Sequence, residues 1–343
     1  MKVIDVRNVN HAYHHGIAAI YDILDKPGCT LPSRVGMVYR FPTAVATVYQ
    51  KPTERVLFNV KRDANPFFHF FEALWMLAGR NDVSWITQFN SKFGTYSDDG
   101  DTFNAAYGYR WRNYFQYDQL VTVIGLLRKD PWNRRVVLGM WNPHRDLVDG
   151  HSKDLPCNLN VKFLGHLRDG RMFLDMHVYN RSNDIIWGAY GANAVHMSIL
   201  HEYVAFGAGM AVGTYTQISS DWHAYCEQFA KSAEASKFYA TPEDVVGISE
   251  HDDLYGKHAV RPMALVDDID VFDAELEHAM EGTRFQNNQN TMIHNLFWPM
   301  MDAYRFYKEK QHESAIKALL TEPLQGNDWA EACVRWLDRR VRK

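Results

Sequence analysis

Cysteine is scarce in this chain of 343 residues, and its thiols are scattered. The four cysteines are Cys29, Cys157, Cys226 and Cys333, with no CxxC pair or other spacing typical of metal ligands. No apolar stretch approaches the roughly 18 residues that cross a membrane, and the N-terminus has no apolar signal core. We therefore expect a protein of the reducing cytoplasm without disulfides, metal or membrane contact.

A strong excess of charge is also lacking. The net charge is -4 with the histidines neutral, which does not suit a general binder of polyanions. The basic end "RWLDRRVRK" favours the solvated last turn of a helix, where cations suit the helix dipole. A nucleic-acid-binding module that uses this end is therefore disfavoured, and we expect no nucleic-acid partner.

Apolar residues, in contrast, are plentiful. Hydrophobic residues make up 46% and aromatic residues 14% of the chain, which predicts a globular protein with a sizeable core. Asn65 and Pro66 predict the start of a helix that ends at Gly79. Apolar residues at helical spacing predict further helices after Asp118 and Asn193.

Two segments between these helices are typical of strands. "RRVVLGMWN" is one, and residues 172–179 alternate with period two. The irregular alternation of strands and helices favours an α+β or mixed α/β fold. After about residue 274 the chain is helical in character, with segments near 292–310, 312–320 and 328–341. We interpret this part as an appended helical extension.

Glu72 is unusual because its helix has almost no polar face. A carboxylate there is expected to be buried, and a buried charge needs a partner or a shifted pKa. A structural pairing with an arginine and a role as a proton relay are about equally weighted alternatives.

Several arginines stand where segments begin or end. Arg134 and Arg135 are expected to begin one strand, Arg181 to end another, and Arg34 to lie in an early loop. Guanidinium groups match phosphate oxygens, so together they could form a phosphate site. Solvated strand ends would explain any single one of them.

Three further features have both a functional and a structural interpretation. Gly188 and Gly191 indicate a close approach of the backbone or a plain turn. His223 and Tyr225 could bind a sugar hydroxyl or be satisfied within the fold. Cys157 could be a packed apolar residue or a nucleophile whose pKa a nearby arginine lowers.

These segments together resemble the thymidylate synthase family, which includes the deoxycytidylate and deoxyuridylate hydroxymethylases. The resemblance covers more than half of the chain, from about Arg34 to Tyr225. The motifs are "FEALWMLAG", "NAAYGYRWR", "DPWNRRVVLGMWNP", "LPCN", "NRSNDIIWG" and "DWHAY". One such motif would be weak evidence, but six in chain order are strong.

The resemblance implies a thymidylate synthase-like catalytic domain over residues 1–274, with a large mixed sheet and flanking helices, and a helical extension over 275–343. It also implies a homodimer whose sheets pack together. The substrate would be a pyrimidine deoxynucleoside monophosphate, and 5,10-methylenetetrahydrofolate would donate the carbon. No metal is implied.

Catalytic roles follow from the resemblance motif by motif. Cys157 would attack C6 of the pyrimidine, and Glu72 would move protons. Arg181 would hold phosphate and favour the thiolate, and Asp184 would face the pterin. The expected substrate-binding residues are Arg34, Arg134, Arg135, Ser182, Asn183, Asn193, His223 and Tyr225. Arg134 and Arg135 would reach the phosphate site of the neighbouring subunit. The expected folate-binding residues are Trp75, Phe93, Tyr96 and Asp184.

The sequence departs from the synthases at three places. Asn158 follows the nucleophile where they usually have histidine, and Phe93 and Tyr96 are the nearest equivalents of their tryptophans. The chain continues into helices instead of a short apolar tail. These departures weaken the case for hydride transfer, which needs a closed, dry site. We favour a 5-hydroxymethyl product, with thymidylate synthesis as the alternative. An inactive family member is disfavoured by the retention of Cys157, Glu72 and Arg181.

The residue that would read the base is ambiguous, because "GAYGAN" is one residue longer than the usual spacing. Counted from Gly188 without a gap, the base-reading position of the family falls on Ala192. With one inserted residue it falls on Asn193. We prefer Asn193, whose amide both donates and accepts and so suits uracil. The choice between uracil and cytosine stays open at this point.

Overall fold

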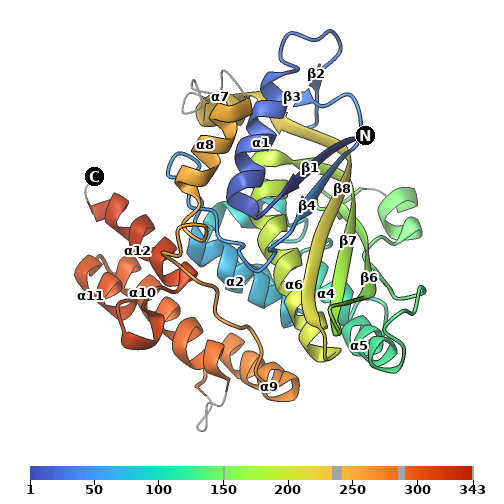
Figure 1. The fold of residues 1–343 in the computed structure, drawn as a ribbon. Helices are drawn as coiled ribbons and strands as arrows, with labels where there is room; N and C mark the ends of the chain where they lie inside the picture. The colour runs from blue at the N-terminus through green and yellow to red at the C-terminus, as the bar shows by residue number, and fades with distance from the viewer. Residues whose placement is uncertain (150, 234–241, 285–289, 342–343) are drawn as a thin grey trace.

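The computed structural model describes residues 1–149, 151–233, 242–284 and 290–341. Its centre is an eight-stranded mixed sheet whose main path is β1-β4-β8-β7-β6-β5 (Figure 1). The β2–β3 hairpin joins this path through β3, which pairs with β8. β1/β4 and β7/β8 are parallel pairs, and the other pairs are antiparallel. The strands are β1 (Lys2–Val6), β2 (Thr30–Pro32), β3 (Met37–Arg40), β4 (Val45–Tyr49), β5 (Val137–Gly139), β6 (Asn158–Arg168), β7 (Arg171–Asp184) and β8 (Ala211–Tyr225).

Helices cover one face of this sheet. α1 (Val9–Tyr21) and α6 (Asn193–Gly207) pack against the strands, and α2 (Pro66–Leu77) packs on α6 (Figure 1). The other helices before residue 253 are α3 (Val83–Ile86), α4 (Tyr107–Arg112), α5 (Gln119–Lys129), α7 (Cys226–Ala233) and α8 (Pro242–Asp252). Short helical turns cover Ser91–Tyr96, His144–Asp149 and Ile185–Ala192. The predicted mixed α/β architecture is therefore confirmed.

The predicted start and end of α2 and the predicted alternation in β7 are both found in the structure. The side chain of Asn65 accepts a hydrogen bond from the Phe68 N–H at the start of α2, and Gly79 after its end has a positive φ of 69°. In β7, Leu174, Met176 and Val178 are all fully buried towards the helices.

The predicted strand at "RRVVLGMWN" is shorter than expected. Arg134 and Arg135 lie in a turn ahead of β5, not at the start of a strand. The side chain of Asn133 accepts the N–H of Arg135 at 3.2 Å, which satisfies that backbone group locally. Both arginines are exposed.

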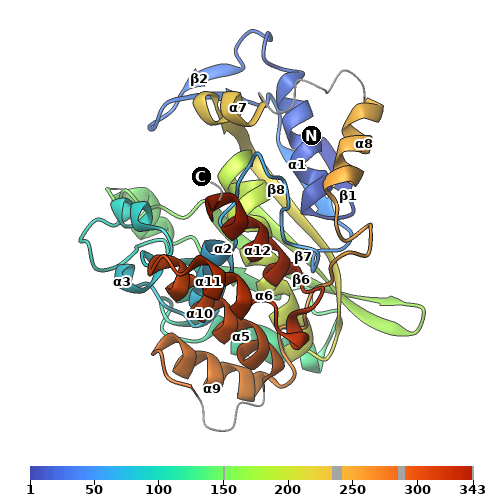
Figure 2. The ribbon, with the colours of Figure 1, turned by 90° about the vertical axis from the view of Figure 1, so that its left-hand side faces the viewer.

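The C-terminal part is helical, as predicted, and packs against α2 (Figure 2). Its elements are α9 (Ile269–Met280), a turn at Ile293–Phe297, α10 (Trp298–Lys308), α11 (His312–Ala318), a turn at Glu322–Leu324 and α12 (Asp328–Val341). α9 runs through the expected boundary at 274/275. Ring centroids of Phe70 and Trp329 lie 5.3 Å apart, and those of Phe67 and Trp336 lie 5.7 Å apart. The extension thus shares the core of the preceding residues.

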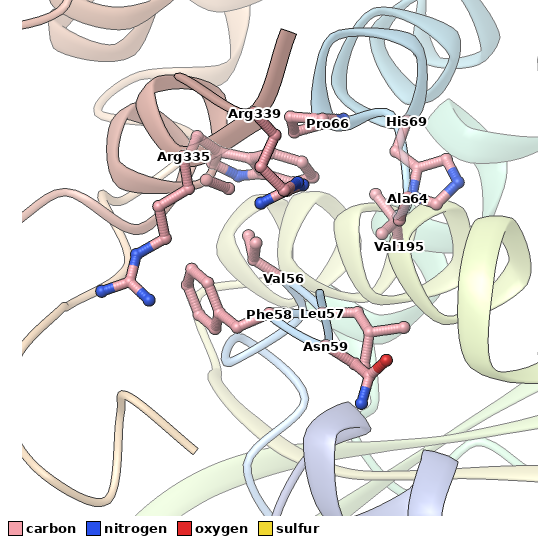
Figure 3. Close-up of a pocket in the computed structure, with 12 residues that line it drawn as sticks. Val56, Leu57, Phe58, Asn59, Ala64, Pro66, His69, Val195, Arg335 and Arg339 are labelled. Carbon is pink, nitrogen blue, oxygen red and sulfur yellow. The ribbon is translucent and has the colours of Figure 1, made fainter. Parts of the chain in front are cut away.

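The basic end is not simply solvated, which corrects the expectation for this segment. Arg339 and Arg340 both bind Asp63, with N···O distances of 2.9 and 3.0 Å. A small pocket lies beside this contact, where α12 meets residues 56–59, His69 of α2 and Val195 of α6 (Figure 3). The last helix therefore contacts α2, which carries Glu72, and lines this pocket together with α6, which carries Asn193.

None of the helices in the described ranges is both long and apolar enough to span a bilayer.

Candidate active site

Cys157 lies immediately before β6, where two cavities meet. Its backbone N–H donates a hydrogen bond of 3.2 Å to the hydroxyl of Tyr107 on α4. One cavity, of about 400 Å³, opens towards the β2–β3 hairpin and the ends of β7 and β8. The other, of about 220 Å³, lies between α2, α4, α6 and the 91–96 turn. Cys157 lines both cavities, so the nucleophile candidate lies at their junction.

The first cavity brings together most of the predicted phosphate and sugar ligands. Its polar lining consists of Ser33, Arg34, Arg40, Arg181, Ser182, Asp221, His223 and Tyr225. Arg181 donates to the carbonyl groups of Pro156 and Leu155 at 2.9 and 3.1 Å, which fixes the guanidinium group beside the nucleophile. The carboxylate of Asp221 accepts a hydrogen bond of 2.8 Å from Nδ1 of His223, which orients that ring. The cavity therefore offers cations for a phosphate next to neutral donors for a sugar.

The second cavity has aromatic walls and two carboxyl groups, those of Glu72 and Asp154. Trp75, Phe93, Tyr96, Phe103 and Tyr107 supply the rings. Such walls fit a flat heterocycle, because rings stack on rings. The predicted folate-binding residues Trp75, Phe93 and Tyr96 therefore do line one cavity with Cys157.

Burial and the neighbouring arginines change the pKa of Cys157 in opposite directions. Burial raises the pKa of the Cys157 thiol above its ordinary value, and the Asp154 carboxylate adds to this effect. Arg181 and Arg34 lower the pKa but do not outweigh burial. The expectation that a nearby arginine makes this group a thiolate is therefore incomplete, because Arg181 only moderates the rise. A phosphate bound to these arginines would weaken their effect further.

Asp154 has a perturbed pKa of its own. Burial raises the pKa of Asp154 to about 6, against a hydrogen bond from the Ala105 N–H at 2.8 Å. The carboxyl lines the second cavity with Cys157 and so titrates near neutrality beside the nucleophile.

Glu72 is buried, with 3% of its surface exposed, and its neighbour is a histidine rather than an arginine. Its Oε2 lies 2.9 Å from Nε2 of His196 on α6. The two groups are close but misaligned, so Oε2 of Glu72 and both ring nitrogens of His196 have no hydrogen-bond partner among the described residues. The structural alternative of a Glu72–Arg pair is thus wrong.

Asn193 is held by two other asparagines. It donates from Nδ2 to Oδ1 of Asn183 at 3.0 Å, and its Oδ1 lies 3.5 Å from Nδ2 of Asn158. Asn183 is anchored in turn by Gln217 and Ser219 of β8 at 3.1 Å each. Asn183 itself does not line either cavity, so in this structure it positions Asn193.

The segment Ile185–Ala192, which contains "GAYGA", forms a π-helix whose backbone is non-helical at Tyr190 and Gly191. α6 then begins at Asn193. A Cβ on Gly188 would lie 2.7 Å from Oδ1 of Asn183, so the predicted close approach at this glycine is confirmed. Ala192 and Asn193 both line the second cavity, but only Asn193 offers a polar side chain there.

Besides Asn183, three predicted site residues lie outside the walls of both cavities. Asp184 caps the π-helix by accepting the N–H groups of Ile186 and Trp187 at 3.0 and 3.1 Å. Arg134 and Arg135 lie in the turn before β5. The roles expected for these three residues towards folate and towards a partner's phosphate stay predictions.

The sequence did not reveal four residues that the structure places at the site. Arg40, Asp154 and His196 line the cavities, and Tyr107 accepts the amide of the nucleophile. His196 could have been found from its spacing of three residues from Asn193, which puts both on one face of α6. Across the described ranges, we find no cluster of three or more potential metal ligands.

Comparison with known proteins gives a consistent result. The family model described as "Thymidylate synthase" matches residues 56–258. The chain is 44% identical over 343 residues, 99% of this chain and 95% of the relative, to a deoxyuridylate hydroxymethyltransferase of Pseudomonas phage M6. Proteins of the same name from Bacillus phage SP01 and Delftia phage PhiW-14 are 41% and 30% identical over 191 and 184 residues. These two alignments cover 53% and 51% of this chain, and 49% and 50% of the relatives.

The resemblance inferred from six separate motifs is thus confirmed by the match over more than half of the chain and by the full-length relative. The chain belongs to the thymidylate synthase family.

Proposed function

We propose that the protein is a transferase that adds a one-carbon unit to C5 of deoxyuridylate and hydrates it to a 5-hydroxymethyl group. The observation that carries this proposal is the position of Cys157 at the junction of the two cavities, one rich in guanidinium groups and one with aromatic walls around Glu72. The names of the three phage relatives support the choice of substrate and product.

The nucleotide occupies the first cavity in this proposal. Arg34, Arg181 and Ser182 hold the phosphate, since guanidinium forks pair with phosphate oxygens. His223 and Tyr225 hold the sugar hydroxyl. Arg134 and Arg135 are exposed and reach the phosphate site of the second subunit in a homodimer.

The base extends from the first cavity into the second, where Asn193 meets its edge. Its amide can donate to O4 and accept from N3–H of uracil, whereas a cytosine reader would need a carboxylate. The fixed hydrogen bonds between Asn193, Asn183 and β8 set the orientation of this amide. We therefore favour deoxyuridylate over deoxycytidylate.

The reaction begins with addition of the Cys157 sulfur to C6 of the bound pyrimidine, which makes C5 nucleophilic. Methylenetetrahydrofolate, held against Trp75, Phe93 and Tyr96, supplies the carbon that C5 receives. Glu72, buried in the wall of the same cavity, moves protons to and from the pyrimidine. Elimination of the Cys157 thiolate from C6 releases the product.

A homodimer fits the second face of the central sheet. This face carries the half-exposed side chains of Leu164, Phe173, Tyr179, Thr216 and Ile218. Two such faces can pack together around a two-fold axis. The free thiols suit a reducing compartment, so we place the protein in the cytoplasm of the host cell.

The proposal is tested with purified protein, deoxyuridylate and methylenetetrahydrofolate. A hydroxymethylase consumes the nucleotide without forming dihydrofolate. The absorbance of the pterin band, which rises when dihydrofolate forms, should therefore stay constant. Formation of one dihydrofolate per nucleotide would instead identify a thymidylate synthase. Deoxycytidylate in a parallel reaction tests the choice of base.

A further inference from the structure

His196 is a buried side chain with unused hydrogen-bonding capacity in the wall of the second cavity. It lies one turn after Asn193 on α6 and is 2% exposed. Neither of its ring nitrogens has a hydrogen-bond partner among the described residues, and the same holds for Oε2 of Glu72. Burying such groups without a partner costs free energy, so this arrangement indicates a polar molecule that binds beside them, on the side of the cavity.

The two side chains are well suited to bind a water molecule. Nε2 of His196 and Oε2 of Glu72 are 2.9 Å apart, and both residues line the cavity that Cys157 and Asn193 also line. An imidazole ring can donate from one nitrogen and accept at the other, and a carboxylate only accepts. A water in the cavity that contacts both groups can therefore be oriented by the histidine and lose a proton to the pair.

We infer that His196 is the positioning residue which, with Glu72, holds the water that adds to the one-carbon unit on C5. This inference rests on the proposed hydroxymethyl product. The water oxygen forms a bond to the exocyclic carbon, and its proton passes to the Glu72–His196 pair. The electron pair of the exocyclic double bond moves into the ring, and the C5–C6 double bond forms as the C6–S bond breaks. Cys157 leaves as thiolate, and nothing is oxidised or reduced.

His201 on the same helix shows what a purely structural histidine looks like in this protein. Its Nε2 is 2.6 Å from the carbonyl oxygen of Leu174 in the sheet, and burial lowers the pKa of His201 to about 4. It does not line the second cavity, so it provides a matched control for loss of a buried imidazole on α6.

The experiment compares the full-length wild-type protein with His196→Leu and His201→Gln. Each is incubated with deoxyuridylate labelled with tritium at C5, methylenetetrahydrofolate and 2-mercaptoethanol. Tritium release counts the molecules in which C5 has received the carbon and lost its hydrogen. Mass spectrometry then separates the hydroxymethyl product from the thioether formed when the thiol captures the same carbon.

For His196→Leu we expect the hydroxymethyl product per tritium released to fall at least tenfold, with the thioether in its place. His201→Gln should keep the wild-type ratio. A wild-type ratio in His196→Leu, an equal fall in His201→Gln, or loss of tritium release in a folded His196→Leu would each overturn the inference. If His196→Leu does not fold, His196→Asn, which shortens the polar group, must show a fall in the same ratio.

The two levels of the proposal fail in different ways. A wild-type protein that makes methyl product and dihydrofolate would disprove the proposed function itself. A wild-type protein that makes hydroxymethyl product while His196→Leu keeps the same ratio would disprove only the role of His196.

Discussion

The backbone N–H of Cys157 donates to the hydroxyl of Tyr107 across 3.2 Å, and this bond ties the nucleophile to α4. α4 is in turn fixed on α2, because a Cβ at Gly108 would lie 1.8 Å from the carbonyl oxygen of Met76. The side chain of Tyr107 therefore ties the loop with the sulfur to α4, and a close backbone contact holds α4 on the helix with Glu72.

Replacement of the nucleophile should abolish turnover. We expect Cys157→Ser to lose at least about a thousandfold in kcat, or roughly 4 kcal/mol in the barrier, because a hydroxyl ionises poorly. Nucleotide binding, measured by calorimetry, should persist. Cys226→Ser, a partly buried thiol on α7, is the control and should retain turnover. Near-normal turnover of Cys157→Ser would exclude covalent catalysis by this residue.

The charges around the thiol predict two changes of opposite sign. The Asp154 carboxylate raises the pKa of Cys157, so Asp154→Asn should lower that pKa and increase the thiolate fraction at pH 7.5. Arg181 lowers the pKa of Cys157, so Arg181→Gln should decrease the thiolate fraction. The measurement is the rate of alkylation by iodoacetamide at Cys157, followed by peptide mass spectrometry. We expect a severalfold increase for the first variant and a decrease for the second. Two changes of the same sign would contradict this account.

Because Arg134 and Arg135 are exposed, we expect two inactive variants to complement each other in a mixed dimer. If these arginines complete the phosphate site of the neighbouring subunit, a mixed dimer of Arg134→Ala/Arg135→Ala with Cys157→Ser contains one intact site. Mixing the two inactive proteins should then restore part of the activity. Subunit exchange is verified with differently tagged chains. Exchange without recovery would mean that each site is built from one chain.

Asp328 at the start of α12 should make the stability of the fold depend on pH. It accepts the hydroxyl of Tyr255 at 2.7 Å, and burial raises the pKa of Asp328 from 3.8 to about 7. Between about pH 4 and pH 7 the unfolded chain has lost this proton and the folded chain keeps it. The contribution of this group to the free energy of unfolding therefore falls as the pH rises, and it levels off above about pH 7.

Asp328→Asn removes this titration while it preserves the volume of the side chain. The free energy of unfolding of the variant, relative to wild type, should increase from pH 4.5 to pH 7.5 by up to about 3 kcal/mol. Chemical denaturation at several pH values measures this difference. A difference that is constant over the whole range would show that Asp328 titrates alike in both states.

Much of the fold and half of the site could be predicted because they depend on local signals. The caps of α2 and the alternation in β7 depend on residues that are close in sequence, and the motif around Cys157 is contiguous. The turn at Arg134 was missed because Asn133 satisfies the backbone there. His196 and Asp154 were missed because their importance comes from contacts with Glu72 and Cys157, which are far away in the sequence. The contact of Arg339 and Arg340 with Asp63 was missed for the same reason.

The identity of the group added to C5 is the central claim, and the reaction in oxygen-18 water tests it most directly. The wild-type protein is incubated with deoxyuridylate and methylenetetrahydrofolate in this solvent, and the molecular mass of the nucleotide product is measured by mass spectrometry. The account predicts a 5-hydroxymethyl nucleotide that carries one oxygen-18 atom from solvent, with no dihydrofolate formed. A product that gains one CH2 unit without solvent oxygen, together with one dihydrofolate per nucleotide, would contradict it.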